Sequence, residues 1–217
     1  MRLVASLGEQ QVLENILEAS KPPLFAGTEK LHYLLATPFR YRPREGSRFR
    51  SAFAAGVWYG AEHLRSAFAE KSYWRLRFLL DSPGTPALGP VPHTAFNAAV
   101  RARAIDLTRP PLAQDRKQWT HRTDYSATQQ LADAARAAGV EAIRYESVRD
   151  PQHAACAALL VPASFAQPQP LQLASWFIAA GRQRVRCLRA DAAETLSGAT
   201  RSQPAAFEFE CRQLLDG

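Results

Sequence analysis

The first hydrophobic pattern along the chain is typical of an amphipathic helix near the N-terminus. Ser6 is followed three residues later by Glu9, which is the spacing of a capping box, and Pro22 ends any helix that reaches it. Between these signals we expect a helix over residues 7–19. Apolar side chains that recur at helical spacing would form one face, namely Leu7, Val12, Leu13, Ile16 and Leu17.

A second, short helix is expected to begin near Thr28 and to end before Pro38, because a residue that precedes proline avoids the helical conformation. Residues 1–36 are therefore interpreted as an N-terminal helical arm. A partner or a second subunit is one candidate to cover the apolar face of this arm. Packing of that face on the protein's own core is the prediction that we favour.

The middle of the chain alternates between loop, strand and helix signals. Residues 38–50 are polar and arginine-rich and predict a loop with a short strand, whereas residues 56–59 predict a strand. Apolar residues at helical spacing predict a long helix over residues 63–80. Four prolines over residues 83–92 predict an irregular connection.

The second half of the chain has mostly strand signals. Alternation predicts a strand within residues 96–107, and a helix is expected between a second capping box, Ser126 to Gln129, and a stop at Gly139. Further strands are expected over residues 140–148, 156–161, 185–188 and 207–211, with a linker over 167–170. Several strands and a few helices in mixed order indicate the α+β class.

Composition narrows the class of protein. The chain has 217 residues, of which 47% are hydrophobic, so it suits one domain with a sizeable core. No apolar run is long enough for a transmembrane helix, the start of the chain does not resemble a signal peptide, and the three cysteines are widely spaced. We therefore expect a cytoplasmic protein without a disulfide framework. A formal net charge of +7 favours anionic partners such as nucleotides, nucleic acid or an acidic protein.

Five short segments, taken in order, resemble a known family. They read Thr-Pro-Phe-Arg-Tyr-Arg-Pro over residues 37–43, Gly-Ser-Arg-Phe-Arg over 46–50, Val-Trp-Tyr-Gly-Ala over 57–61, Ser-Ala-Phe-Ala-Glu over 66–70 and Tyr-Glu-Ser-Val-Arg over 145–149. Together they resemble the RES domain family, which is named for its Arg, Glu and Ser. The resemblance implies a compact fold with a split, mixed β-sheet and flanking helices, similar to ADP-ribosyltransferases. It makes residues 37–217 one NAD-binding catalytic domain.

The resemblance implies roles for four residues. Arg48 would clamp a pyrophosphate, because a guanidinium binds phosphate through a bidentate fork, and Tyr59 would contact nicotinamide or its ribose. Glu70 would stabilise the oxocarbenium-like centre that forms when the nicotinamide–ribose bond breaks. Ser147 would hydrogen-bond a ligand phosphate or orient the glutamate. It is not expected to be a nucleophile, because no His and Asp accompany it in a triad-like pattern.

Further arginines are secondary candidates for the same ligand: Arg40 and Arg42 for the pyrophosphate, and Arg149 for a further anion contact. The chain departs from the family at Arg50, where Asn is more usual, and at Glu146, which replaces a proline. The scattered histidines form no metal-binding spacing, so no metal is expected. No glycine-rich dinucleotide loop occurs either, so NAD would lie in a cleft of another kind.

Outside the motif, each of these residues has a common structural interpretation. A helix glutamate such as Glu70 usually lies exposed and paired with a neighbouring cation, and a strand tyrosine such as Tyr59 is usually half-buried. Trp58, the neighbour of Tyr59, should point to the opposite face of the strand and enter the core. Glu62 is the alternative carboxylate, although it comes early in the motif.

The leading hypothesis is the toxin of a bacterial type II toxin–antitoxin system that consumes NAD and so arrests growth. Water as acceptor would make it an NAD glycohydrolase, inorganic phosphate an NAD phosphorylase, and a protein side chain an ADP-ribosyltransferase. The implied partner is an antitoxin with an Xre-like helix-turn-helix domain, through which alone the protein would meet nucleic acid. A homodimer formed through the arm stays open.

Two other hypotheses stay open. One is a basic nucleic-acid-binding module, because arginine and aromatic residues together suit single strands. It rests on residues 39–50, which carry Arg40, Arg42, Arg44, Arg48 and Arg50 among Phe39, Tyr41 and Phe49. It predicts strong salt dependence and indifference to Glu70→Gln. The other is an inactive RES homologue that only binds its partner.

Overall fold

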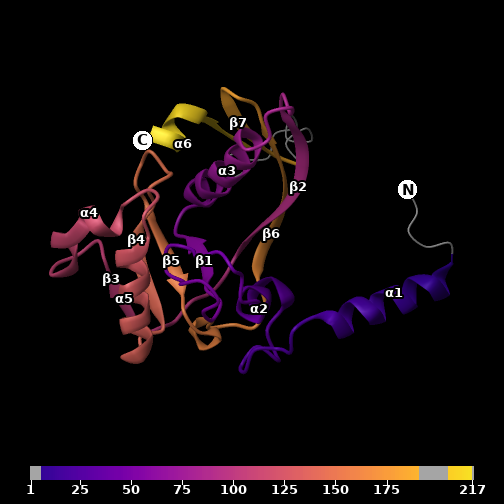
Figure 1. Ribbon diagram of the computed structural model, residues 1–217, viewed down its shortest axis with the longest axis horizontal. Coiled ribbons are helices and arrows are strands. Elements are labelled where there is room, and N and C mark those ends of the chain that lie inside the picture. The colour runs from indigo at the N-terminus through magenta and orange to yellow at the C-terminus, as the bar shows by residue number, and fades with distance from the viewer. Residues whose placement is uncertain (1–5, 191–204, 217) are drawn as a thin grey trace, which may run out of the picture.

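The computed structural model describes residues 6–190 and 205–216 of the chain. In these residues helices flank two four-stranded sheets, which confirms the α+β class (Figure 1). The predicted similarity to ADP-ribosyltransferases and the predicted boundary after residue 36 stay predictions. No helix in the described ranges has the length and apolar character needed to cross a membrane.

The first sheet has the strand order β1-β5-β4-β3. Its first three strands are antiparallel, and β3 runs parallel to β4. The bounds are Trp58–Ala61 for β1, Ala104–Asp106 for β3, Ala142–Glu146 for β4 and Ala155–Leu159 for β5. The two central strands, β4 and β5, are mostly buried, because α5 covers one face and α2 packs near the other.

The second sheet is antiparallel throughout and has the order β2-β6-β7-β8. Its bounds are Leu88–Asn97 for β2, Leu171–Ala180 for β6, Arg184–Arg189 for β7 and Ala206–Glu210 for β8. The remaining elements are α1 Leu7–Ser20, α2 Tyr33–Arg40, α3 Leu64–Leu80, α4 Arg116–Trp119, α5 Ser126–Ala137 and α6 Cys211–Asp216, with 3-10 turns at Leu112–Asp115 and Pro162–Ser164.

Helix α3 contacts strands of both sheets and so sets their relative position (Figure 1). One of its faces buries Phe68 and Leu76 against Trp176, Ile178 and Phe209 of the second sheet. Burial of side chains of this size contributes about 1.5–3 kcal/mol each. The other face of its N-terminal half is directed toward the first sheet, and this is where Glu70 lies. The long helix predicted from periodicity is confirmed.

The strand predictions from periodicity are confirmed in outline for β1, β4, β5, β7 and β8, with shifted ends. The prediction of an irregular, proline-rich connection over residues 83–92 holds for residues 83–87 and is wrong from Leu88 on, because β2 runs through Pro90 and Pro92. This strand is at the edge of its sheet, where a missing N–H need not interrupt a ladder. The single strand predicted within residues 96–107 is instead the end of β2 and the short β3. Strand β6 was not predicted at all.

Two helix starts also differ from the prediction. Helix α2 begins at Tyr33, where the side chain of His32 accepts the N–H of Leu34 at 3.3 Å, and it continues through Pro38. The buried side chain of Phe39 anchors this turn in the core, so packing overrides the proline. Helix α5 begins at Ser126, and the expected capping box does not form there. The side chain of Asp124 accepts the N–H of Ser126 instead.

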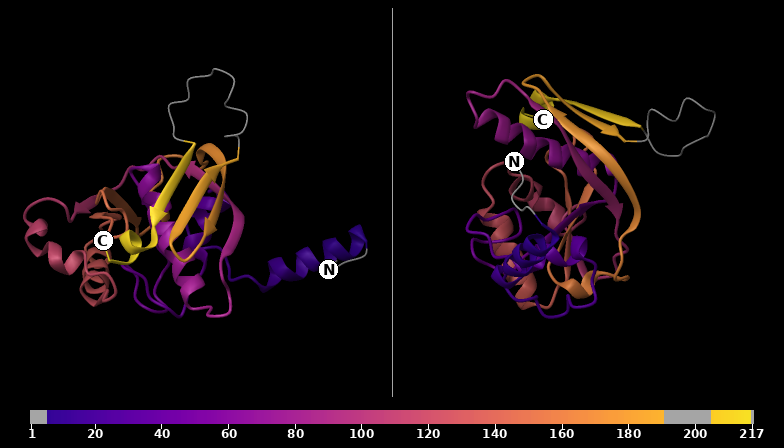
Figure 2. Two further views of the ribbon diagram at one scale, coloured as in Figure 1. Left: turned by 90° about the horizontal axis from the view of Figure 1, so that it is seen from above. Right: turned by 90° about the vertical axis from the view of Figure 1, so that its right-hand side faces the viewer.

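Helix α1 forms as predicted, with the Ser6 side chain accepting the N–H of Glu9 at 3.2 Å. The prediction that its apolar face packs on the protein's own core is wrong. Val12, Ile16 and Leu17 are 58%, 60% and 52% exposed, and the helix extends away from both sheets (Figures 1 and 2). Residues 1–5 of the predicted arm lie outside the described residues.

Candidate active site

Elements from distant parts of the chain meet around one pocket of about 270 Å³. Helix α3, strand β1, the loop at residues 46–50 and the turn after β4 all contribute to it. The pocket brings together four predicted residues, Arg48, Tyr59, Glu70 and Arg149. The other lining residues are Ser47, Gly60, Ala61, Ala67, Lys71, Tyr73, Trp74, Tyr125, Tyr145 and Cys156.

Arg48 is buried at the wall of the pocket and is held from one side. Its Nη1 donates to the carbonyls of Trp119 and His121 at 2.8 and 3.0 Å, and its guanidinium lies 4.7 Å from the ring centroid of Tyr125. Among the described residues, its Nε and Nη2 have no hydrogen-bond partner. A guanidinium fixed in this way presents its remaining N–H groups to an anion with little loss of side-chain freedom.

Tyr59 on β1 holds the loop that carries Arg48. Its hydroxyl lies 2.8 Å from the Ser47 hydroxyl and accepts the N–H of Phe49 at 3.0 Å. The side chain is 38% exposed, so its ring forms part of the pocket wall while its hydroxyl end is enclosed. This enclosure raises the pKa of the Tyr59 hydroxyl. The residue is therefore well placed to stack on a ligand but has its hydroxyl engaged.

Glu70 and Ser147 are in direct contact across the α3–β4 junction. The Ser147 hydroxyl donates to Oε1 of Glu70 at 2.7 Å and accepts the N–H groups of Arg149 and Asp150 at 3.2 and 3.0 Å. Ser147 is fully buried, and it lies behind Glu70 rather than in the pocket lining. Of the two predicted roles for this serine, orienting the glutamate fits this geometry and contacting a phosphate does not.

The surroundings of Glu70 perturb its ionisation. Burial of the carboxyl raises the pKa of Glu70 above 4.5, and the hydrogen bond from Ser147 and the charges of Arg48 and Arg149 offset only part of this rise. A carboxylate with a raised pKa, in a pocket and beside specific charged partners, is typical of a functional site. The sequence prediction of Glu70 as the important carboxylate therefore has geometric and electrostatic support.

A second buried carboxylate, Asp150, was not predicted. It accepts the Ser66 hydroxyl at 2.5 Å and lies 3.3 Å from Nε of Arg65, so it ties the turn after β4 to α3. Ser66 and Glu70 are one helical turn apart, and this anchor therefore supports the contact between Glu70 and Ser147. The signal that could have found it is the Ser-x-x-Asp spacing, in which the Ser147 side chain accepts the aspartate N–H.

Aromatic rings line the pocket beside the arginines, and apart from Tyr59 the sequence analysis did not name them as site candidates. The Arg149 guanidinium lies 3.6 Å from the ring centroid of Tyr73, and its Nη2 donates to the Arg122 carbonyl at 2.5 Å. Trp74 is largely exposed at the pocket. Aromatic rings and fixed guanidinium groups suit a ligand with a flat ring and a phosphate.

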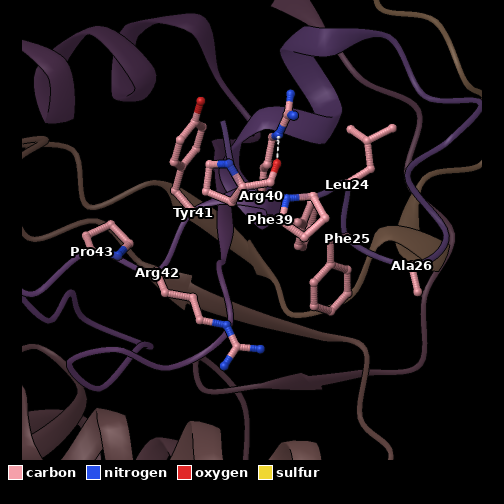
Figure 3. Close-up of a pocket in the computed structure, with 10 residues that line it drawn as sticks. Leu24, Phe25, Ala26, Phe39, Arg40, Tyr41, Arg42 and Pro43 are labelled. Atoms are coloured by element: carbon pink, nitrogen blue, oxygen red, sulfur yellow. Dashed lines mark hydrogen bonds between the residues drawn. The ribbon is translucent and has the colours of Figure 1, made fainter. Parts of the chain in front are cut away.

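Arg40 and Arg42 line a different pocket, shown in Figure 3. Nε of Arg40 donates to the Pro22 carbonyl at 2.6 Å, and its Nη1 lies 3.1 Å from the Glu18 carboxylate. The structure therefore does not place these two arginines with Arg48 around one pyrophosphate.

The two remaining predictions near β1 have mixed outcomes. Glu62, the alternative carboxylate, is exposed and paired with Arg144 through Nε at 2.5 Å, which lowers the pKa of Glu62. Trp58 does point away from Tyr59, toward Phe96 and Phe165, but it is half-buried rather than fully in the core.

Neither a metal nor a reactive thiol is indicated at the pocket. Within residues 6–190 and 205–216, no three His, Cys, Asp or Glu side chains are grouped so that they could hold a metal ion. Cys156 lines the pocket wall, and burial raises the pKa of its thiol to about 12. A thiol with such a pKa stays protonated at neutral pH and is a poor nucleophile.

A comparison with protein families decides the classification. The model of the RES domain matches residues 24–179, which include the pocket, the whole first sheet, and strands β2 and β6 of the second sheet. The chain belongs to the RES domain family. This confirms the family predicted from the five sequence segments, and this family is associated with NAD-related enzymatic activity. No curated protein matches the chain closely enough to count as a relative.

The two departures of this RES domain from the expected motif have structural explanations. Arg50 is buried and donates to the carbonyls of Pro43 and Glu45 at 3.1 and 2.6 Å, so it holds the loop and does not line the pocket. Glu146 pairs with Arg116 and lies 3.0 Å from Nδ1 of His153. Arg50 stabilises the loop that carries Arg48, and Glu146 stabilises the segment that carries Ser147. Neither side chain lines the pocket.

Proposed function

We propose that the protein cleaves the bond between nicotinamide and ribose in NAD. The observation that carries the proposal is Glu70, a pocket carboxylate of raised pKa held by Ser147 beside the guanidinium groups of Arg48 and Arg149. NAD offers a matching set of groups, namely a pyrophosphate, a flat cationic ring and a glycosidic bond between them. NAD would be the substrate, and no metal cofactor takes part in the proposal.

The arginines and aromatic rings would bind and orient the dinucleotide. Arg48 would receive the pyrophosphate through Nε and Nη2, because its Nη1 is already engaged by the backbone. Arg149 would supply a second positive charge, and the ring of Tyr59 would pack on nicotinamide or its ribose. A pocket of about 270 Å³ suits the nicotinamide–ribose half of NAD, with the rest of the ligand extending out of it.

Glu70 would act in its ionised form. As the bond breaks, positive charge develops on the ribose, and a fixed carboxylate stabilises it. Glycoside hydrolases generally need a second carboxyl group to protonate the leaving group. Nicotinamide is already cationic in NAD and leaves as a neutral molecule, so one carboxylate is sufficient. Ser147 would fix the position of Glu70 without forming a covalent bond.

The acceptor of the ADP-ribosyl group is proposed to be small, either water or inorganic phosphate. A protein side chain as acceptor, which would make the protein an ADP-ribosyltransferase, is the alternative. Consumption of NAD in the cytoplasm would arrest growth, and the biological role proposed is that of a toxin. Its partner would be an antitoxin with an Xre-like helix-turn-helix domain.

The proposed activity predicts that the purified protein releases nicotinamide from NAD, and that Glu70→Gln lowers this rate about 10²–10³-fold, as for other fixed groups that stabilise transition-state charge. Chromatography of the products, with and without inorganic phosphate, measures the rate and identifies the acceptor. ADP-ribose would indicate water, and a phosphorylated product would indicate phosphate.

Glu62→Gln is the matched control, because Glu62 is an exposed carboxylate paired with Arg144 outside this pocket. It should retain the wild-type rate. Full activity of Glu70→Gln would contradict the assignment of that residue. Failure of the wild-type protein to release nicotinamide unless a protein acceptor is added would favour the ADP-ribosyltransferase alternative.

A further inference from the structure

Helix α1 has an apolar face that nothing in the described chain covers. Val12, Ile16 and Leu17 lie on this face and are all more than half exposed, although they recur at the spacing of a buried helix face. The helix has 14 residues and is about 21 Å long, so it extends well beyond the body of the protein (Figures 1 and 2). A face of this kind normally marks a contact with another molecule.

A large pocket of about 790 Å³ lies where the arm joins the body of the protein. Its lining is mostly apolar and comes from residues 22–26 and 39–43 (Figure 3). Leu24 and Tyr41 are exposed within it. Because α1 runs away from this pocket, the arm of a given molecule does not fill the pocket of the same molecule.

The charges of the arm and of the pocket are complementary. Helix α1 carries Glu9, Glu14 and Glu18 and has no lysine or arginine, whereas the chain as a whole has a net charge of +7. The pocket lining contains Arg40 and Arg42 and no acidic residue. Arg40 already pairs with Glu18 of its own arm. Arg42 is exposed, and its side chain extends away from Arg40 (Figure 3).

We propose that two copies of this chain exchange their arms. The apolar face of α1 of each copy would occupy the 790 Å³ pocket of the other. Arg42 would then face Glu9 of the incoming helix, which lies on the apolar face because it precedes Val12 and Ile16 by three and seven residues. A second copy is the favoured occupant because both complementary surfaces are on one chain, so a twofold axis satisfies them at once. The active-site pocket is lined by other residues and stays outside this interface.

The oligomeric state of the full-length protein tests the proposal. Sedimentation analysis over a range of concentrations should give twice the 24.0 kDa mass of one chain. Ile16→Asp, which places a charge on the apolar face, should weaken the dimer at least 10-fold in dissociation constant. Gln11→Asp is the matched control on the opposite face of α1, and it should leave the dissociation constant within about threefold.

Two further variants test the pocket side of the interface. Arg42→Glu should weaken the dimer, whereas Arg44→Glu, which is outside the pocket lining, should not.

Cross-linking then distinguishes arm exchange from a simple pairing of two arms. A mixture of Val12→Cys and Leu24→Cys proteins should form a disulfide between copies, and the three native cysteines are buried and do not compete.

Several results would overturn the proposal. They are a monomeric wild-type protein at all concentrations, an Ile16→Asp dimer as tight as the wild type, or Val12→Cys proteins that cross-link to each other but not to Leu24→Cys. A monomer that becomes larger only with a different protein would assign the surface to that partner. Nicotinamide release by Ile16→Asp should equal that of the wild type, so this test is independent of the proposed activity.

Discussion

The ionised carboxylate of Glu70, which the proposed function requires, lowers the stability of the folded protein. Its folded-state pKa is raised above 4.5 because its carboxyl is buried, so the folded protein binds this proton more tightly than the unfolded chain does. The corresponding stability is fully present below about pH 4.5 and is lost as the pH rises through the raised pKa. At neutral pH the ionised Glu70 therefore destabilises the fold.

Glu70→Gln should raise the melting temperature at pH 7 by about 2–4 °C, which corresponds to roughly 1 kcal/mol for a chain of this size. The amide oxygen can still accept the Ser147 hydroxyl, and the cost of the buried charge disappears. Calorimetry at a series of pH values should find that the difference shrinks as the pH falls from 7 through the raised pKa toward 4.5 and changes little below that. A variant less stable than the wild type at pH 7 would contradict the proposed burial of charge.

Glu62→Gln supplies a control of opposite sign. The pKa of Glu62 is lowered by its hydrogen bonds to Arg144, so its ionised form contributes stability above pH 4.5 that is lost as the pH falls through the lowered pKa. Its replacement should lower the melting temperature slightly at pH 7, because exposed ion pairs contribute little.

Among the secondary-structure elements, α3 and the turn after β4 together position Glu70, the carboxylate that we propose to be catalytic. Two hydrogen bonds connect them, one from Ser147 to Glu70 and one from Ser66 to Asp150. The helix is also held against the second sheet by its apolar face. The position of Glu70 therefore depends on packing at both sides of one helix.

Two buried serines of α3 make a matched pair for testing this anchor. Ser66→Ala leaves the buried Asp150 without the hydroxyl and should cost about 1–3 kcal/mol of stability. It should also lower the rate constant of nicotinamide release about 10-fold, with little change in KM, because Glu70 loses its fixed position. Denaturant unfolding and steady-state kinetics measure both effects.

Ser72→Ala is the comparison, because Ser72 is equally buried but, among the described residues, its hydroxyl has only the weak hydrogen-bond partner Cys187, at 3.6 Å. It should change neither kinetic constant. Equal kinetic losses in the two variants would indicate a general effect of α3 packing rather than a specific anchor at Asp150.

At the scale of the whole molecule, the distribution of arginine argues against a nucleic-acid-binding surface. Of the arginines that suggested such a surface, Arg48 and Arg50 are buried and bonded to backbone carbonyls, and Arg40 pairs with Glu18. Only Arg42 and Arg44 remain exposed in that segment.

We therefore expect weak binding of single-stranded RNA that disappears near physiological ionic strength, about 0.15 M. Fluorescence anisotropy of a labelled oligonucleotide in a salt series measures it. Tight binding that persists at that ionic strength, and that Arg42→Glu abolishes, would favour the nucleic-acid hypothesis instead.

The sequence by itself determined the elements whose signals are local. Periodicity predicts α1 and α3, and apolar runs predict the central strands β4 and β5, because burial of one helix face or both strand faces imposes a pattern on neighbouring residues. It also determined the family and the identity of Arg48, Tyr59, Glu70 and Ser147 as site candidates. Those residues occur in short segments with a characteristic order.

Only the tertiary structure decided features that depend on contacts between distant segments. Whether the prolines of β2 permit a strand depends on its position at the sheet edge, and Pro38 is tolerated in α2 because Phe39 is anchored in the core. In the same way, Ser147 was a site candidate with two roles until the fold placed it behind Glu70. The physical reason is that burial, and with it hydrogen bonding and ionisation, is set by the chain segments that pack together, and no local pattern records which segments those are.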